Sequence, residues 1–168
     1  MKYQKIKFNN ISNGESIRTS LFVSGCEHRC KGCFQPESWN KNNGLDYTVE
    51  TENEIINSLK PNYIKGLTLL GGEPMMAYNI PDLIRLCQRV KEELPTKDIW
   101  LYTGYTIEEI IKDKQKLELL SYCDVLIDGK FDETLYSPKL RFRGSSNQRI
   151  IKDKETLMTG SIVLHEKN

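Results

Sequence analysis

The chain has 168 residues, a length that suits one compact domain. Hydrophobic residues make up 38% and charged residues 28%, a balance typical of a soluble globular protein. The net charge of +1 is too small to indicate nucleic acid or a membrane surface as the main partner, and no apolar run approaches the roughly 20 residues that span a bilayer. The first ten residues lack the apolar core of a signal peptide, so we expect a cytoplasmic protein.

Strand and helix patterns alternate along residues 16–130. In chain order, they predict a strand over 16–24, a helix over 51–59 capped by Thr51, a strand over 66–70, a helix over 81–94, a strand over 99–103, one continuous helix over 106–120 and a strand over 124–127. The tail after Ser137 is less regular and richer in lysine and arginine.

This alternation predicts an α/β fold of mostly parallel strands joined by crossover helices. The predicted strands are uniformly apolar, as expected when both faces of a sheet are covered. Four or five strand–helix units are too few for a complete eight-stranded barrel, which needs about 250 residues. An open, partial barrel and a doubly wound sheet both remain, in a single domain covering 1–168.

Four polar turns follow the carboxyl ends of the predicted strands. They are the cysteine loop after the first strand, Gly71-Gly72-Glu73-Pro74, Thr103-Gly104-Tyr105 and Asp128-Gly129-Lys130. Parallel α/β folds place their ligand sites at that edge of the sheet. We therefore expect the four turns to converge on one rim.

Three of the five cysteines form the pattern Cys26-x3-Cys30-x2-Cys33. An odd cysteine count with one tight cluster does not fit a disulfide framework. Three thiolates suit a [4Fe-4S] cluster and leave one iron open to a substrate, as catalytic metal sites keep a free position. The alternative is a zinc site with His28 as fourth ligand, although its spacing from Cys26 and Cys30 matches no usual zinc pattern.

The cysteine pattern followed by Gly71-Gly72-Glu73-Pro74 resembles the radical S-adenosylmethionine (SAM) superfamily. Within it, the chain is similar to the activating proteins of anaerobic ribonucleoside-triphosphate reductases over five segments that together span most of its length. These are SLFVSGCEHRCKGCFQPESW (20–39), LTLLGGEPM (67–75), LYTGYT (101–106), DVLIDGKF (124–131) and RFRGSSNQRII (141–151).

The resemblance implies an open, partial β/α barrel of the radical SAM type, with SAM chelating the fourth iron of the cluster. It implies reductive cleavage of SAM to a 5′-deoxyadenosyl radical, which takes a hydrogen from a glycine of the large reductase subunit. It also implies flavodoxin or ferredoxin as electron donor. The alternatives within the superfamily are an activase of another glycyl radical enzyme and a radical SAM enzyme that acts on a small metabolite. An alternative from another class is an electron carrier, in which protein ligands would be expected on all four irons.

By the same resemblance, specific residues take roles at the cofactor. The cluster ligands are Cys26, Cys30 and Cys33, and the SAM contacts are Gly32, Cys33, Phe34, Gly71, Gly72, Glu73, Thr103 and Lys130. Glu73 braces its loop, and the backbone of 32–34 contacts adenine, although Gly32 stands where the superfamily often has an aromatic residue. Asp128 is a candidate ligand of a monovalent cation, or simply a solvated loop charge.

The remaining reactive residues have weaker signals. Cys87 and Cys123 are predicted to be structural, and His28 either modulates the cluster or is solvated. The basic tail is a solvated face or docks an acidic partner surface; its members are Lys139, Arg141, Arg143, Arg149, Lys152 and Lys154. Lys130, Arg141 and Arg143 are the candidates for ordering the partner.

Overall fold

A computed structural model describes residues 1–168 and shows one mixed, seven-stranded sheet in the order β3-β1-β2-β4-β5-β6-β7. The parallel centre consists of β2 (Ile17–Val23), β4 (Ile64–Gly71), β5 (Asp98–Tyr102) and β6 (Val125–Asp128). The antiparallel strands are β1 (Lys2–Asn10), β3 (Leu45–Asp46) and β7 (Arg149–Lys152). β3 and β7 do not pair with each other, so the sheet is open. The predicted α/β class with mostly parallel strands is confirmed.

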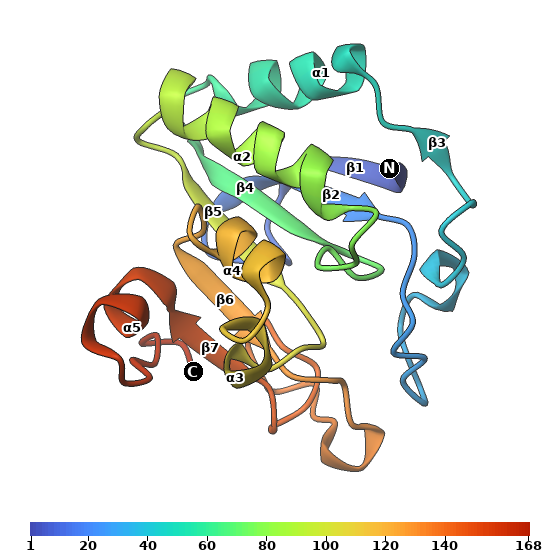
Figure 1. Cartoon of the computed structure of the whole chain (residues 1–168), viewed down its shortest axis with the longest axis vertical. Coiled ribbons are helices and arrows are strands. Elements are labelled where there is room, and N and C mark those ends of the chain that lie inside the picture. The colour runs from blue at the N-terminus through green and yellow to red at the C-terminus, as the bar shows by residue number, and fades with distance from the viewer.

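The helices that link the parallel strands cover one face of the sheet (Figure 1). They are α1 (Val49–Leu59), α2 (Ile80–Glu93), α3 (Ile107–Ile110) and α4 (Lys114–Leu120), and α5 (Asp153–Thr159) follows β7. Short 3-10 helices lie at Pro36–Ser38 and Glu133–Leu135. None of the helices combines the length and apolar character that crossing a membrane requires.

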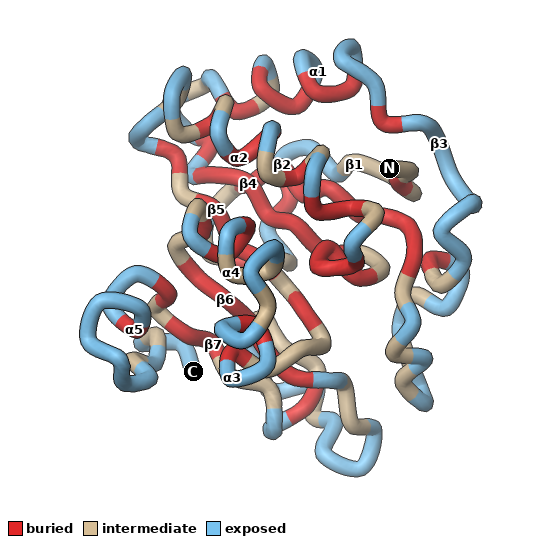
Figure 2. Tube along the Cα trace, viewed as in Figure 1, coloured by how far each residue is buried: buried red, intermediate tan, exposed pale blue.

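The main core lies between these helices and the sheet and joins 25 buried residues (Figure 2). Cys87 and Cys123 belong to it and are fully buried, which confirms their structural assignment. The opposite, helix-free face carries a smaller cluster of Trp100, Val125, Ile127 and Ile150, against which Tyr102 and Phe142 pack. Successive side chains of each strand point alternately to these two faces, because a β-strand is pleated.

Arg18 is fully buried and holds the loop between β1 and β2 against the helix-free face of the sheet. Its guanidinium pairs with Asp98 at 2.6 Å and donates to the Thr68 hydroxyl at 2.7 Å. The Thr68 hydroxyl in turn donates to the carbonyl of Asn13 at 2.7 Å. The loop before β2 is therefore held against the sheet by a charge that is both paired and hydrogen-bonded, as a buried cation requires.

Two predictions about the helices were wrong in detail. Thr48, not Thr51, is the N-cap of α1. The two residues form a capping box, in which the Thr48 hydroxyl accepts the Thr51 amide and the Thr51 hydroxyl accepts the Thr48 amide. The predicted helix over 106–120 is broken into α3 and α4. Asp113 causes the break, because its carboxylate accepts the amides of Gln115 and Lys116 and so starts a new helix.

Apart from the two short 3-10 helices, four elements have no counterpart in the sequence-based prediction: β1, the two-residue β3, β7 and α5. β1 forms from the alternating lysines and apolar residues at the start of the chain, a period-two pattern typical of a strand with one face packed. β7 and α5 form in the tail that showed no clear periodicity. β7 gains its order from long-range pairing with β6, which local pattern does not report.

Candidate functional site

A cavity of about 450 Å³ opens where the parallel strands end, within the size range of ligand sites. All four predicted turns contribute to its lining, with Cys26, His28, Cys30 and Cys33 from the first, Gly71, Gly72 and Glu73 from the second, Thr103 and Gly104 from the third, and Gly129 from the fourth. The structure thus brings together the turns that the sequence placed on one rim.

The cysteine loop is tied to the glycine turn through the backbone. The Gly25 carbonyl accepts the Glu73 amide at 2.7 Å, and the Gly25 amide donates to the Ser38 carbonyl at 2.6 Å. A Cβ on Gly72 would lie 2.6 Å from the Gly25 oxygen, so a side chain there would drive the two segments apart. Glycine at 72 is therefore needed for the approach of one backbone to another.

The three loop thiols are free and half-buried. Burial raises the pKa of Cys26 to about 11, and burial likewise raises the pKa of Cys30. Nowhere do three cysteine, histidine or carboxylate side chains converge closely enough to hold a single metal ion. A cluster instead shares its thiolates among separate irons, so this donor set fits a [4Fe-4S] group better than the alternative zinc site.

Glu73 joins three of the four turns through one buried carboxylate. It accepts the Gly104 amide at 2.7 Å, the Thr103 hydroxyl at 2.8 and 2.9 Å and, from its own turn, the Met75 amide at 2.8 Å. His28 Nε2 lies 2.7 Å from Glu73 Oε1, and its ring meets Tyr105 edge-on at 4.6 Å. This geometry supports the bracing role predicted for Glu73. It also places His28, the fourth ligand of the alternative zinc site, in contact with a carboxylate.

Phe34 lies at the mouth of the cavity with 63% of its surface exposed. Its ring packs against Phe131 and Tyr136 at centroid distances of 5.0 and 5.8 Å. We call these three residues the aromatic rim. Gly32 and Lys130 are exposed and do not line the main cavity, and Lys130 borders a neighbouring hollow. Their assignment to SAM stays a prediction.

Asp128 is buried beneath the rim in an ion pair with Arg149. One carboxylate oxygen accepts Arg149 Nε at 3.0 Å, and the other accepts the Ile107 amide at 2.9 Å. Hydrogen bonds to Asp128 and Glu108 raise the pKa of Arg149. The geometry does not favour the cation site predicted on Asp128, because a guanidinium already neutralises it. Arg149 is likewise not the free docking charge predicted for the basic tail.

The inner wall of the cavity contains residues that sequence reasoning did not assign to the site. They are Phe22, Leu70, Tyr102, Phe142 and Gln148, together with Arg143, which had been predicted only as a docking residue. The available signal was strand alternation, since Tyr102 lies on the opposite face of β5 from the core residue Leu101.

Residues 12–151 match the family model described as a 4Fe-4S single cluster domain. Proteins named anaerobic ribonucleoside-triphosphate reductase-activating protein are similar to the chain over nearly its whole length. The protein from Haemophilus influenzae is 47% identical over 156 residues, which is 92% of this chain and 99% of the relative. The one from enterobacteria phage T4 is 44% identical over 150 residues, 89% of this chain and 93% of the relative. The one from Escherichia coli is 42% identical, covering 88% and 96%.

The chain belongs to this family of activating proteins. The family assignment confirms the resemblance drawn from the five sequence segments. The 4Fe-4S description of the family model also agrees with the presence of three cysteine thiols in the lining of the cavity.

Proposed function

We propose that this activating protein holds a [4Fe-4S] cluster on Cys26, Cys30 and Cys33, binds SAM at the open iron and generates a glycyl radical on anaerobic ribonucleoside-triphosphate reductase. The observation that carries the proposal is that three thiols line the same cavity as the Gly71–Glu73 turn. In this proposal the open sheet is a partial barrel of the radical SAM type, and residues 1–168 form a single domain.

When bound, the cluster supplies the electron for cleavage of SAM to methionine and a 5′-deoxyadenosyl radical, so the protein's own work is positioning and exclusion of water. In this proposal the Gly71-Gly72 turn contacts the methionine end of SAM through backbone carbonyl groups, because the Gly72 amide already donates to the Val23 carbonyl at 2.9 Å. Glu73 fixes that turn, because its carboxylate already holds the Thr103 hydroxyl and the Gly104 amide. Phe34 offers an apolar ring at the mouth of the cavity for the adenine.

The proposed substrate is a protein, and the electron donor is a flavodoxin or ferredoxin. The names of the relatives state that they activate anaerobic ribonucleoside-triphosphate reductase. The exposed aromatic rim supports a macromolecular substrate, because an apolar patch beside a cavity is covered when a partner docks. Three free thiols suit a reducing compartment, and we place the protein in the cytoplasm.

The test is anaerobic reconstitution followed by incubation with SAM, a strong reductant and a cognate reductase. We expect one [4Fe-4S] cluster per chain, formation of 5′-deoxyadenosine and an EPR doublet on the reductase that disappears when its target glycine is replaced by alanine. Cys30→Ala should abolish all three signals, whereas Cys87→Ala, which alters a buried core thiol, should keep the cluster.

Two results would overturn parts of the proposal. Full cluster content in the Cys30→Ala protein would remove the ligand assignment. SAM cleavage without a glycyl signal on a cognate reductase would remove the activase function and favour a radical SAM enzyme with a small metabolite as substrate.

A further inference from the structure

The cysteine loop is held at its two ends by backbone hydrogen bonds and between them by side chains. The Cys26 amide donates to the Trp39 carbonyl at 3.0 Å, and the Cys33 amide donates to the Cys30 carbonyl at 3.1 Å. No backbone amide or carbonyl of residues 27–29 bonds to another backbone group. The position of this middle segment therefore depends on its side chains.

His28 anchors the middle segment inside the protein. Its side chain is 7% exposed, and its Nε2 donates to the Glu73 carboxylate, which lies 2.7 Å away. The same carboxylate accepts the Thr103 hydroxyl and the Gly104 amide, so the imidazole completes a set of donors around one buried group. A Cβ on Gly104 would lie 2.6 Å from His28 Cδ2, which means that this glycine leaves the room that the imidazole occupies.

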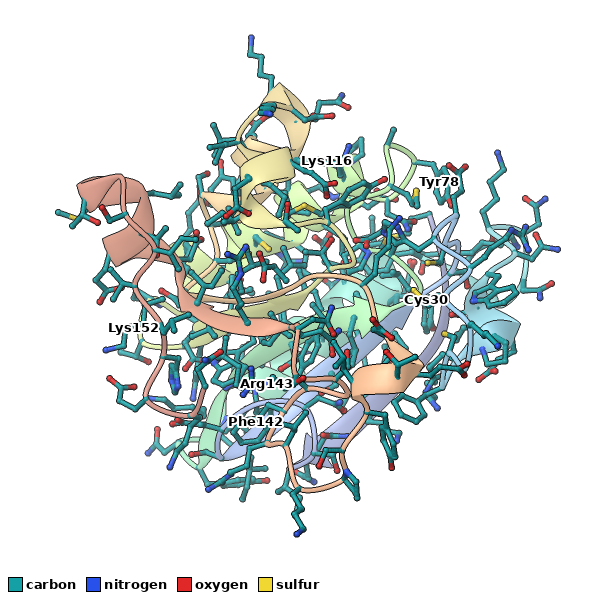
Figure 3. All side chains as sticks on the ribbon, turned by 90° about the horizontal axis from the view of Figure 1, so that it is seen from below. Cys30, Tyr78, Lys116, Phe142, Arg143 and Lys152 are labelled. Atoms are coloured by element: carbon teal, nitrogen blue, oxygen red, sulfur yellow. The ribbon has the colours of Figure 1, made fainter.

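The imidazole is also packed from outside the cavity. Its ring meets Tyr105 edge-on at a centroid distance of 4.6 Å, and Lys116 Nζ lies 4.7 Å from the centre of the Tyr105 ring. Neither Tyr105 nor Lys116 lines the cavity. In Figure 3 Lys116 lies above Cys30, whereas Arg143, which lines the cavity, lies below it. His28 is thus held from two directions, through Glu73 on one and through Tyr105 on the other.

The anchored segment directs backbone N–H groups at the first cysteine. Burial raises the pKa of Cys26, and the amides of His28 and Arg29 oppose this rise by hydrogen bonding to the thiol. Arg29 has a φ of 51°, a left-handed conformation that is costly for a residue other than glycine and persists only where its surroundings fix it. Successive amides in a turn of this kind form a concave site for an anion, as they do around many iron–sulfur centres.

Hydrogen bonds to the sulfurs are one of the factors that set the reduction potential of an iron–sulfur cluster. Reduction adds negative charge to the cluster and its thiolates. Amide donors therefore stabilise the reduced form more than the oxidised form, because hydrogen bonds strengthen with the charge on the acceptor. The loop supplies a further donor of this kind, since the Gln35 amide donates to Cys33 Sγ at 3.4 Å. The donors at Cys26 differ from it in belonging to the segment that His28 holds.

We propose that His28 is a positioning residue, which holds the segment 27–29 around Cys26 and thereby raises the reduction potential of the bound cluster. It acts through the loop rather than on the iron, because Glu73 engages its Nε2. Its role is to make the cluster easier to reduce by the single electron that SAM cleavage requires. The inference rests on the cluster ligands of the proposed function, and it depends neither on the glycyl radical nor on the identity of the partner protein.

The test is a redox titration of the reconstituted protein with dithionite, followed by EPR, without SAM or reductase. His28→Leu removes the donor but keeps a buried side chain. We expect the equilibrium constant for one-electron reduction to fall about tenfold, which moves the midpoint potential by about 59 mV to more negative values. His28→Gln keeps an N–H donor near the position of Nε2 and should retain the wild-type potential. His165→Leu is the matched control, because His165 also contacts a carboxylate, Glu15, and an aromatic ring but lies outside the cavity.

A second measurement needs no cluster. The peptide bond after Arg29 is a trypsin site at the end of the anchored segment, and a loop that has lost its anchor opens more often and is cut faster. In the metal-free protein we expect cleavage after Arg29 to be several-fold faster in His28→Leu than in the wild type. Cleavage after the exposed Arg141 is the internal control and should not change. Gly104→Ala, which keeps the histidine but displaces it, should show both effects.

A wild-type potential together with a wild-type cleavage rate in His28→Leu and Gly104→Ala would overturn the inference. Equal shifts of the potential in His28→Leu and His28→Gln would also overturn it, because they would assign the effect to the imidazole itself rather than to its hydrogen bond. If His28→Leu holds no cluster, the cleavage rate of the metal-free chain decides in the same two directions. SAM cleavage without a glycyl signal on a cognate reductase would remove the activase function and leave the inference standing.

Discussion

At the scale of single residues, buried carboxylates have very different roles in this protein. Glu73 is surrounded by donors and links three turns of the site. Asp128 is neutralised by Arg149. Asp153, at the start of α5, is fully buried and neither of its oxygens has a protein partner. Burial raises the pKa of Asp153 to about 8, with the neighbouring Asp124 adding to the effect.

Asp153→Asn should therefore remove a pH-dependent cost. The folded state prefers the protonated acid, so the wild type loses stability as pH rises from the unfolded value near 3.8 to the folded value of about 8. The free energy of unfolding of the variant should exceed that of the wild type by an amount that grows by up to about 1.4 kcal/mol per pH unit in this window. Urea titrations of the metal-free protein at pH 5, 7 and 8.5 measure it.

Glu155→Gln is the control, because Glu155 is exposed in the first turn of the same helix. It should leave the pH dependence of stability unchanged. Parallel pH profiles for the wild type and Asp153→Asn would show that Asp153 does not carry its raised pKa in solution.

At the scale of elements, the buried parallel strands were predictable because each is a short apolar run stopped by a polar turn. Every predicted strand was found, with bounds shifted by one or two residues. The helices were less certain, because periodicity reports an apolar face but not the competition between side chain and backbone. Ile107, Ile110 and Leu120 are buried as predicted, yet Asp113 divides the segment and Ile111 is 51% exposed.

Asp113→Ala should destabilise α4 and test the cause of this break. The Asp113 carboxylate accepts two backbone amides, at 3.0 and 3.1 Å, and pairs with Lys116 at 2.9 Å. Removing an N-cap side chain costs about 1 kcal/mol. Thermal or urea unfolding should show a loss of this size, and Lys112→Ala, at an exposed neighbour, should stay within about 0.5 kcal/mol of the wild type. No loss in Asp113→Ala would mean that packing alone sets the helix boundary.

At the scale of the whole molecule, the rim of the site was predictable and its inner wall was not. The carboxyl ends of parallel strands must meet at one edge, so four turns distant in sequence converged as expected. The course of the segment 136–145, which covers this wall, follows no such rule. Its course depends on the bridge between Tyr136 and Ser145 and on the Gln148 side chain, contacts that no local pattern encodes. Arg143 was therefore read as a surface charge when it lines the cavity.

Arg141 is an exposed cation of the segment 136–145, as is Lys139, and it is a better test of partner docking than Arg143, which lines the cavity. Arg141→Glu should slow association with the reductase several-fold at low salt, because charges at the edge of an interface act mainly on the association rate. The difference from the wild type should shrink as salt screens the contact. Surface plasmon resonance under anaerobic conditions measures the rate. Lys114→Glu, on α4, serves as a control, and equal effects of the two variants would point to net charge rather than a local contact.

The cysteine loop contributes no residue to the core of 25 buried side chains. Its shape comes from backbone bonds to the Gly71–Glu73 turn and to the 3-10 helix that follows it. Loss of the cluster to oxygen should consequently leave the hydrophobic core and the sheet folded. We therefore expect that a chain which has lost its cluster can take up a new one without first unfolding.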